Sequence, residues 1–177
     1  MDLDVWPRSD GVPHHGEARW NGAMLPCAIG RAGIRGDKRE GDNATPLGDF
    51  AFRRVLYRPD REKIPATRLE AMPIGEHDGW CDDPADPAYN RPVPLPCPAG
   101  HERLWRPDRL YDLVLVIGHN DDPPVAGKGS AIFVHVARPD WGATEGCIVF
   151  RVEDLRRILA TCDPTSRVRV HAAPRQG

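Results

Sequence analysis

One cysteine and one histidine in the second half of the chain have the types and the spacing of a nucleophile and its base. Cys147 stands in the segment GATEGCIVF, twelve residues after His135 of the segment SAIFVHV. A thiol attacks as its thiolate, whose free pKa is about 8.5, and a neighbouring imidazole can take the proton. Gly142 and Gly146 let the backbone bend, so that N–H groups around residues 146 and 147 can converge as an oxyanion hole. The alternative is a buried structural thiol, because free cysteines are among the most buried residues.

The composition is that of an ordinary globular domain. The chain has 177 residues, 40% of them hydrophobic and 28% charged, which is enough for one hydrophobic core and argues against disorder. A formal net charge of −2 removes the usual electrostatic reason for binding nucleic acid or a membrane surface. No stretch approaches the roughly 20 apolar residues that cross a bilayer. The first 16 residues lack the basic and apolar regions of a secretory signal, so no export signal is visible in this chain.

The five cysteines form no CxxC pair. Cys81 and Cys97 flank a proline-rich loop and could form a disulfide in an oxidising compartment. With His101 they are also candidate metal ligands, but a zinc site requires closer pairs such as C-x₂₋₄-C. The glycines at 30–48 do not follow the spacing of a phosphate-binding loop. We therefore expect neither a metal nor an organic cofactor.

The chain is predicted to be mainly β, with one helix in its C-terminal half. Nineteen prolines favour short strands joined by rigid loops. Asn21-Gly22 is the strongest hairpin signal and divides the segment 17–29 into two strands. Apolar residues recur at helical spacing over 152–161. The other expected elements are strands at 49–58, 111–120, 130–136 and 167–172, irregular chain at 30–48 and 84–98, and loose termini at 1–16 and 173–177. No repeat or domain boundary is visible, so residues 1–177 are expected to form one domain.

In two of the expected strands, the pattern of apolar residues indicates which faces are buried. The segment 111–120 is a continuous apolar run, which is typical of a strand buried on both faces. Side chains alternate along 130–136, so Phe133 and His135 are expected on one face and Val134 and Val136 on the other. The basic run at 59–70 and the acidic run at 76–90 are expected to be solvated loops.

Two separated motifs resemble the catalytic domain of the L,D-transpeptidase (YkuD-type) family. Members of this family have a histidine, a short linker and then S/T-x-G-C followed by a β-branched residue. Members also have a G-D-x-x-T-P-x-G-x-F segment, which lies before this histidine in the chain. The matching residues are His135, Thr144, Gly146, Cys147 and Ile148 in the first motif, and Gly41, Asp42, Thr45, Pro46, Gly48 and Phe50 in the second. The resemblance covers roughly residues 17–171 and implies a β-sandwich or barrel with one helix after the cysteine and a proline-rich loop.

The resemblance implies a chemistry on peptidoglycan stem peptides. The cysteine is acylated by the carbonyl of the third stem residue, with release of a terminal D-alanine, and an amine of a neighbouring stem resolves the thioester. Cys147 matches the nucleophile and His135 the base. A backbone carbonyl after the histidine orients the ring, here that of Val136, and Gly146 and Cys147 would supply oxyanion N–H groups, a triad in which a carbonyl replaces the carboxylate. The family is also acylated by carbapenem-type inhibitors.

Several residues are further candidates for binding substrate. The family often has Arg two residues after the cysteine, where this chain has Val149. Arg151 either meets a substrate carboxylate in its place or is a solvated surface charge. Thr144 belongs to the cysteine motif, and His119 and Asn120 end the strand 111–120, where either could line the cleft. In the proline-rich loop, Trp80, Tyr89, Asn90 and Arg91 either form a lid over the cleft or anchor the loop to the core.

Three functions remain open from the sequence. They are an L,D-transpeptidase, a hydrolase that uses water as acceptor, and a catalytically silent cell-wall binding domain in which Cys147 is structural. The family implies the periplasm or cell envelope as the site of action, although without a visible export signal the cytoplasm stays open. The acceptor, the third stem residue and the oligomeric state do not follow from the sequence.

Overall fold

The computed structural model describes residues 1–176 and is mainly β, with one α-helix in that part of the chain. The elements in chain order are β1 (Asp2–Pro7), β2 (His15–Trp20), β3 (Ala23–Ala28), β4 (Ile34–Arg35), β5 (Thr45–Pro46), β6 (Gly48–Tyr57), β7 (Ala71–Pro73), β8 (Asp78–Cys81), β9 (Pro92–Pro94), β10 (His101–Arg103), β11 (Leu113–Ile117), β12 (Phe133–Val136), β13 (Ile148–Phe150), α1 (Val152–Thr161) and β14 (Arg167–Val170). The expected fold class is confirmed. Of the helices in residues 1–176, none has the length and apolar character to cross a membrane.

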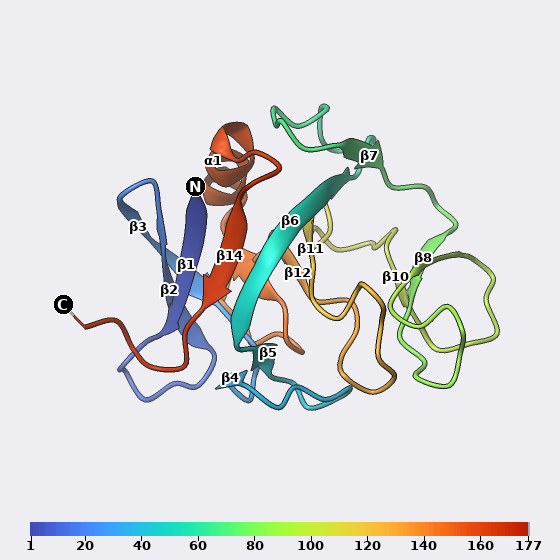
Figure 1. The fold of residues 1–177 in the computed structure, drawn as a ribbon. Coiled ribbons are helices and arrows are strands. Elements are labelled where there is room, and N and C mark those ends of the chain that lie inside the picture. Colours follow the sequence, from blue (N-terminus) through green and yellow to red (C-terminus); the bar gives the residue numbers. More distant parts are fainter. Residues whose placement is uncertain (177) are drawn as a thin grey trace.

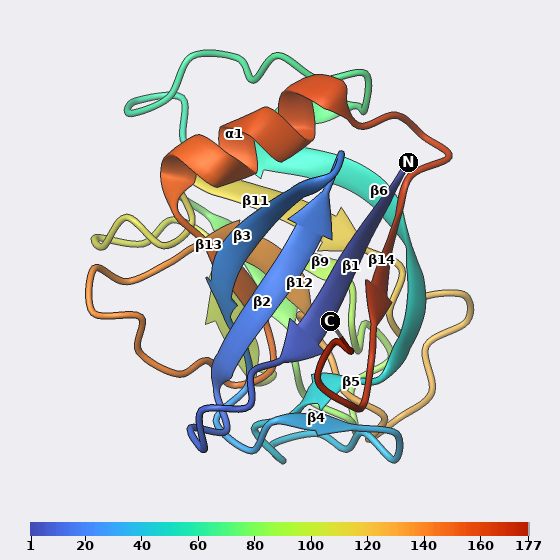
Figure 2. The same cartoon turned by 90° about the vertical axis from the view of Figure 1, so that its left-hand side faces the viewer.

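One large sheet organises the molecule (Figure 1). Its strand order is β11-β12-β13-β3-β2-β1-β14-β6-β7, and β6 also pairs with β11, so the sheet closes into a barrel-like ring with β7 attached to β6. Figure 2 shows β3, β2, β1, β14 and β6 side by side, with α1 lying across one end. A small sheet, β10-β8-β9, lies outside this ring.

The predicted hairpin and helix are both confirmed. Asn21 and Gly22 have φ angles of 48° and 79°, as a two-residue turn that fits the twist of paired strands requires. The helix spans the predicted 152–161 and buries three of its apolar side chains, Leu155, Ile158 and Leu159.

The N-terminus and the proline-rich loop differ from expectation. Residues 1–16 were expected to be loose, but β1 pairs in parallel with β14 and antiparallel with β2, and its Leu3 and Val5 are fully buried. In the segment 84–98, the three residues of β9 form a strand at the edge of the small sheet. An edge strand tolerates proline because its outer N–H positions face no partner. Residues 173–176 lie outside the strands and the helix, and residue 177 lies outside the described residues.

Strands β11 and β12 separate two apolar clusters. The larger cluster contains Leu113, Leu115 and Val134 and is the main core. The smaller contains Val114, Phe133 and, from other parts of the chain, Trp80, Tyr111 and Cys147. The predicted burial on both faces is confirmed for Leu113–Ile117, although the strand ends before residues 118–120, and the predicted alternation is confirmed along β12. This alternation places the cysteine on the same face of the sheet as Phe133.

Candidate active site

The parallel pairing of β12 and β13 brings Cys147 and His135 to one pocket. His135 lies opposite Val149, and Cys147 comes directly before β13, two residues ahead of Val149 and hence on the same face. Both side chains line a cavity of about 510 Å³. They are largely buried, with 8% of Cys147 and 6% of His135 exposed.

The imidazole of His135 is held in one orientation by two backbone carbonyls. Its Nδ1 lies 3.0 Å from the oxygen of Val136 and 3.2 Å from the oxygen of Leu110. Two acceptors at Nδ1 require the proton on that nitrogen, which leaves the lone pair on Nε2. Burial lowers the pKa of His135 to about 4, although both carbonyls oppose this shift. The ring is therefore a neutral base at pH 7, in the tautomer that can accept a proton at Nε2.

The thiol of Cys147 rests in its protonated form. Its Sγ donates to the oxygen of Ala131 at 3.3 Å and accepts the N–H of Phe133 at 3.3 Å. Burial raises the pKa of the thiol to about 12, and the Phe133 N–H offsets only part of this effect. The expectation that the surroundings lower this pKa is thus not met in the resting structure, because desolvation outweighs the backbone donor. The sulfur can attack only as its proton leaves.

The loop before the cysteine is closed by its own hydrogen bonds. The Thr144 hydroxyl donates to the oxygen of Cys147 at 2.6 Å and accepts the N–H of Gly146 at 3.1 Å. Gly146 has φ +140°, and a Cβ there would lie 2.8 Å from the oxygen of Ala44. The Thr144 side chain lines the pocket, but its hydroxyl is used within the loop. The Gly146 N–H, expected to face an oxyanion, is likewise already bonded.

The second motif is bonded directly to this loop. The Thr45 hydroxyl donates to the oxygen of Gly146 at 2.8 Å and accepts the N–H of Gly30 at 2.9 Å. Gly30 has no room for a side chain, because a Cβ would lie 2.5 Å from the oxygen of Asn43. One buried hydroxyl therefore joins two segments that are 101 residues apart and holds the backbone beside Cys147.

Charged side chains of both signs surround the sulfur and the imidazole. The lining includes four basic residues, Arg31, Lys38, Arg106 and Arg138, and four acidic residues, Glu40, Asp82, Glu102 and Glu145. Burial raises the pKa of Asp82 and of Glu102, and nearby Glu40 adds to the shift of Asp82. Sequence reasoning did not single out these eight residues for the site. Lys38 and Glu40 lie just before the G-D-x-x-T-P motif, and Glu145 lies within the T-x-G-C motif, which were the available signals for them. No motif marked the other five.

Three further candidates lie outside this lining. His119 donates its Nε2–H to the oxygen of Lys128 at 3.0 Å and lines a separate cavity of about 140 Å³. The Asn120 side chain donates to the oxygens of Val125 and Gly129 and so braces its own loop. Arg151 is exposed at the start of α1, with its guanidinium 5.4 Å from the ring centre of Trp141. Each of these three side chains is thus accounted for by local structure.

The aromatic residues of the proline-rich loop anchor that loop. Trp80 is buried and donates to Asn90 Oδ1 at 2.9 Å, and the same oxygen accepts the N–H of Ala131 at 3.1 Å. The Tyr89 hydroxyl donates to Glu40 and accepts the N–H of Gly129 at 3.0 Å. These bonds tie the loop to the segment that leads into β12. Cys81 and Cys97, considered as a disulfide pair, are free thiols.

Comparisons with known proteins identify the type of domain. The profile of the L,D-transpeptidase catalytic domain family, YkuD, matches residues 14–170. No curated protein matches the sequence. Two solved structures of the helical cell shape determining protein Pgp2 from Campylobacter jejuni are similar, one of them a lysine-to-alanine mutant. Their sequence identities are 14% and 15% and their TM-scores 0.43 and 0.36, and each match covers 98% of this chain and 48% of the Pgp2 chain. This chain thus spans about half the length of those structures.

Proposed function

The chain belongs to the L,D-transpeptidase catalytic domain (YkuD) family, and we propose that it transfers acyl groups of peptidoglycan stem peptides through a thioester at Cys147. The family supports an activity that modifies peptidoglycan. The observation that carries the finer proposal is the pairing of a thiol with a neutral imidazole in one pocket, with the Nδ1 of His135 held by two carbonyls. Because peptidoglycan is part of the cell envelope, we propose that the domain acts there.

Acylation begins with transfer of the thiol proton to His135 Nε2 as Cys147 Sγ bonds to the carbonyl carbon of the third stem residue. The carbonyl oxygen becomes an oxyanion, which backbone N–H groups stabilise. We propose the Cys147 N–H as one donor, because the Gly146 N–H is bonded to Thr144. The tetrahedral intermediate collapses, the amide C–N bond breaks, and the imidazolium returns its proton to the departing nitrogen of D-alanine. A thioester and a neutral imidazole remain.

The second half of the reaction reverses these roles. An amine of a neighbouring stem attacks the thioester and gives a proton to His135 Nε2. The C–S bond breaks, and the Cys147 sulfur takes the proton back as a thiol. Water in place of the amine would release the free tripeptide. In both halves the carbonyls of Val136 and Leu110 stabilise the imidazolium while it exists, since both accept from Nδ1–H.

The charges of the pocket fit a substrate that carries both carboxylates and amines. Basic and acidic side chains are equally numerous in the lining, and their polar groups surround a thiol that itself sits against apolar residues. A stem peptide offers both kinds of partner, whereas a nucleic acid or an anionic lipid would favour one sign. This mixed lining supports a peptide substrate over a uniformly charged one.

Intact mass spectrometry with a carbapenem tests the nucleophile. We expect one covalent adduct on the wild-type chain, mapped to Cys147 and absent from Cys147→Ala. Cys97→Ala is the matched control, because Cys97 is the most exposed of the other cysteines and lies outside the pocket lining. An adduct that persists in Cys147→Ala, or no adduct on the wild type, would favour a silent binding domain.

Incubation with purified tetrapeptide stems then separates the two enzymatic outcomes. With an amine-bearing acceptor stem present, we expect cross-linked dimers together with free D-alanine. Tripeptide and D-alanine without dimers would identify a hydrolase instead. His135→Gln should abolish both sets of products, because no other imidazole lines the pocket in residues 1–176.

A further inference from the structure

A loop outside the strands supplies one of the two carbonyls that face His135. Leu110, three residues before β11, accepts the N–H of Val136 at 3.1 Å and lies 3.2 Å from His135 Nδ1. The Val136 carbonyl belongs to β12 itself and is fixed by the strand. The Leu110 carbonyl belongs to the loop 106–112, so its position depends both on the Val136 N–H and on the contacts that hold this loop.

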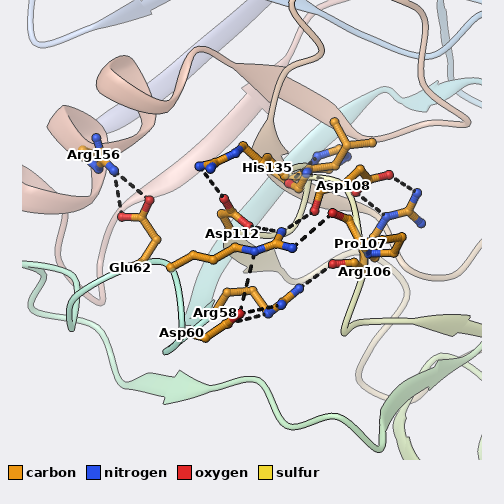
Figure 3. A network of polar contacts seen from close by, with 12 residues as sticks. Arg58, Asp60, Glu62, Arg106, Pro107, Asp108, Asp112, His135 and Arg156 are labelled. Carbon is orange, nitrogen blue, oxygen red and sulfur yellow. Dashed lines mark hydrogen bonds and ion pairs between the residues drawn. The ribbon is translucent and has the colours of Figure 1, made fainter.

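Two arginines hold three consecutive carbonyls of this loop, and Figure 3 labels one of them, Arg58, together with the three residues that carry the carbonyls. Arg58 donates to the oxygen of Arg106, and Arg61 donates to the oxygens of Pro107 at 3.1 Å and Asp108 at 2.7 Å. The planar fork of a guanidinium reaches two neighbouring acceptors from two separate nitrogens, whereas an ammonium would have to reach both from a single nitrogen. The loop is thus clamped immediately before Leu110.

The arginines are themselves fixed by carboxylates and packing. Arg58 is 3% exposed, forms two bonds of 2.9 Å with Asp60, and lies 3.7 Å from the ring centre of Trp105. Arg61 also donates to the buried carboxylate of Asp112 at 3.0 Å. At the far side of the loop, the Asp108 carboxylate accepts the N–H of Leu110 at 3.2 Å. The clamp is therefore continuous from the segment 58–61 to the residue that faces the imidazole.

We propose that Arg61 is a positioning residue for the base: it fixes the loop 106–110 so that the Leu110 carbonyl holds His135 Nδ1–H together with Val136. The proposal rests on the proposed function, in which His135 becomes a buried imidazolium. Arg61 is bonded to neither the sulfur nor the ring, and it acts through the carbonyls of Pro107 and Asp108 and the carboxylate of Asp112.

The expected change in rate follows from the free energy of one hydrogen bond. When His135 takes the thiol proton, its charge is stabilised by both carbonyls. Releasing the Leu110 carbonyl removes one charge-assisted acceptor, and such a loss slows proton transfer by about tenfold. The same release leaves Nδ1–H with one partner, so its exchange with water quickens by about the same factor.

The experiment compares three variants of the full chain. Arg61→Ala removes the clamp, and Arg61→Lys keeps the charge near Asp112 but loses the fork. Arg156→Ala is the matched control, because Arg156 pairs with Glu62 at 2.7 Å in the same region and forms no hydrogen bond or ion pair with the loop 106–112. The readouts are the exchange rate of His135 Nδ1–H by nitrogen-15 NMR and the iodoacetamide rate at Cys147, located by peptide mapping.

We expect about tenfold faster exchange and about tenfold slower alkylation in Arg61→Ala, an intermediate effect in Arg61→Lys, and wild-type values in Arg156→Ala. Unchanged values in a folded Arg61→Ala would overturn the proposal, as would equal changes in Arg156→Ala. If Arg61→Ala does not fold, Arg61→Lys decides, since wild-type exchange in that variant refutes the clamp. Neither readout uses peptidoglycan, so a chain that passes this test but leaves stem peptides intact refutes the proposed function alone.

Discussion

Replacing Thr45 by valine should separate the role of its hydroxyl from that of its shape. The side chain is fully buried and accepts the N–H of Gly30 at 2.9 Å while donating to the oxygen of Gly146 at 2.8 Å. Valine has nearly the same volume but can do neither, so two buried backbone groups lose their partner. Each unsatisfied group costs about 1–3 kcal/mol. We expect the free energy of unfolding to fall by about 3 kcal/mol, a large part of the stability of a typical domain.

Thr45→Ser is the control for this prediction. It keeps the hydroxyl and removes one methyl group, which should cost about 1 kcal/mol. The free energy of unfolding is measured by urea titration at pH 7, and the iodoacetamide rate at Cys147 is measured on the same samples. We expect a slower rate in Thr45→Val, since the Gly146 carbonyl precedes the nucleophile. Equal losses of stability in the valine and serine variants would show that the hydroxyl does not support the loop.

Two further predictions concern His135 and Gly146. The pKa of His135 is lowered from 6.5 to about 4 in the folded chain, so between these values the unfolded chain binds a proton that the folded chain does not. Stability is therefore lost as the pH falls through this window, by about 2 kcal/mol from pH 7 to 5, and urea titrations of His135→Gln should lack this part of the loss. Parallel pH curves for the two chains would contradict the assigned burial. Gly146→Ala places a Cβ 2.8 Å from the oxygen of Ala44 at φ +140°, and we expect thermal unfolding to report a loss of about 2 kcal/mol. Gly142→Ala, whose Cβ meets only side-chain atoms at 3.2 Å, should stay close to the wild type, and a similar loss in both variants would argue against backbone strain at Gly146.

The parts of the fold that depend on neighbouring residues could be predicted from the sequence. The hairpin follows from Asn21-Gly22 because both positions must adopt positive φ angles, which these residues tolerate. Alternation along β12 was sufficient to place Phe133 and His135 on one face, since the direction of a side chain in a strand depends only on its parity. The same parity, read through the register of β13, carries Cys147 to that face.

The parts that depend on distant pairing could not be predicted in this way. The segment of β1 was expected to be loose, yet it pairs with β14, whose residues are 165 positions away. The residues around β1 carry no pattern that indicates such a distant partner. Arg61 lies in a basic run that reads as a solvated loop, and only the folded chain brings the carbonyls of Pro107 and Asp108 to its guanidinium. The sequence also does not show which cavity a loop side chain lines. His119 lies at the end of a predicted strand, but it lines a cavity other than the one with Cys147.

The neutral resting states of the Cys147 thiol and the His135 imidazole explain why fixed hydrogen-bond donors and acceptors surround them. A thiolate and an imidazolium at these two buried positions would require the desolvation of two charges. With pKa values of about 12 for Cys147 and about 4 for His135, the neutral pair is the stable one at pH 7. In the proposed acylation, the ion pair forms only during attack, when an oxyanion also develops beside it. Donors and acceptors fixed in advance, such as the Phe133 N–H and the carbonyls at Nδ1, lower the energy of that short-lived state without having to reorganise. Residues that hold the backbone in place, Thr45 and Arg61 among them, should therefore affect the rate more than exposed charges near the pocket mouth.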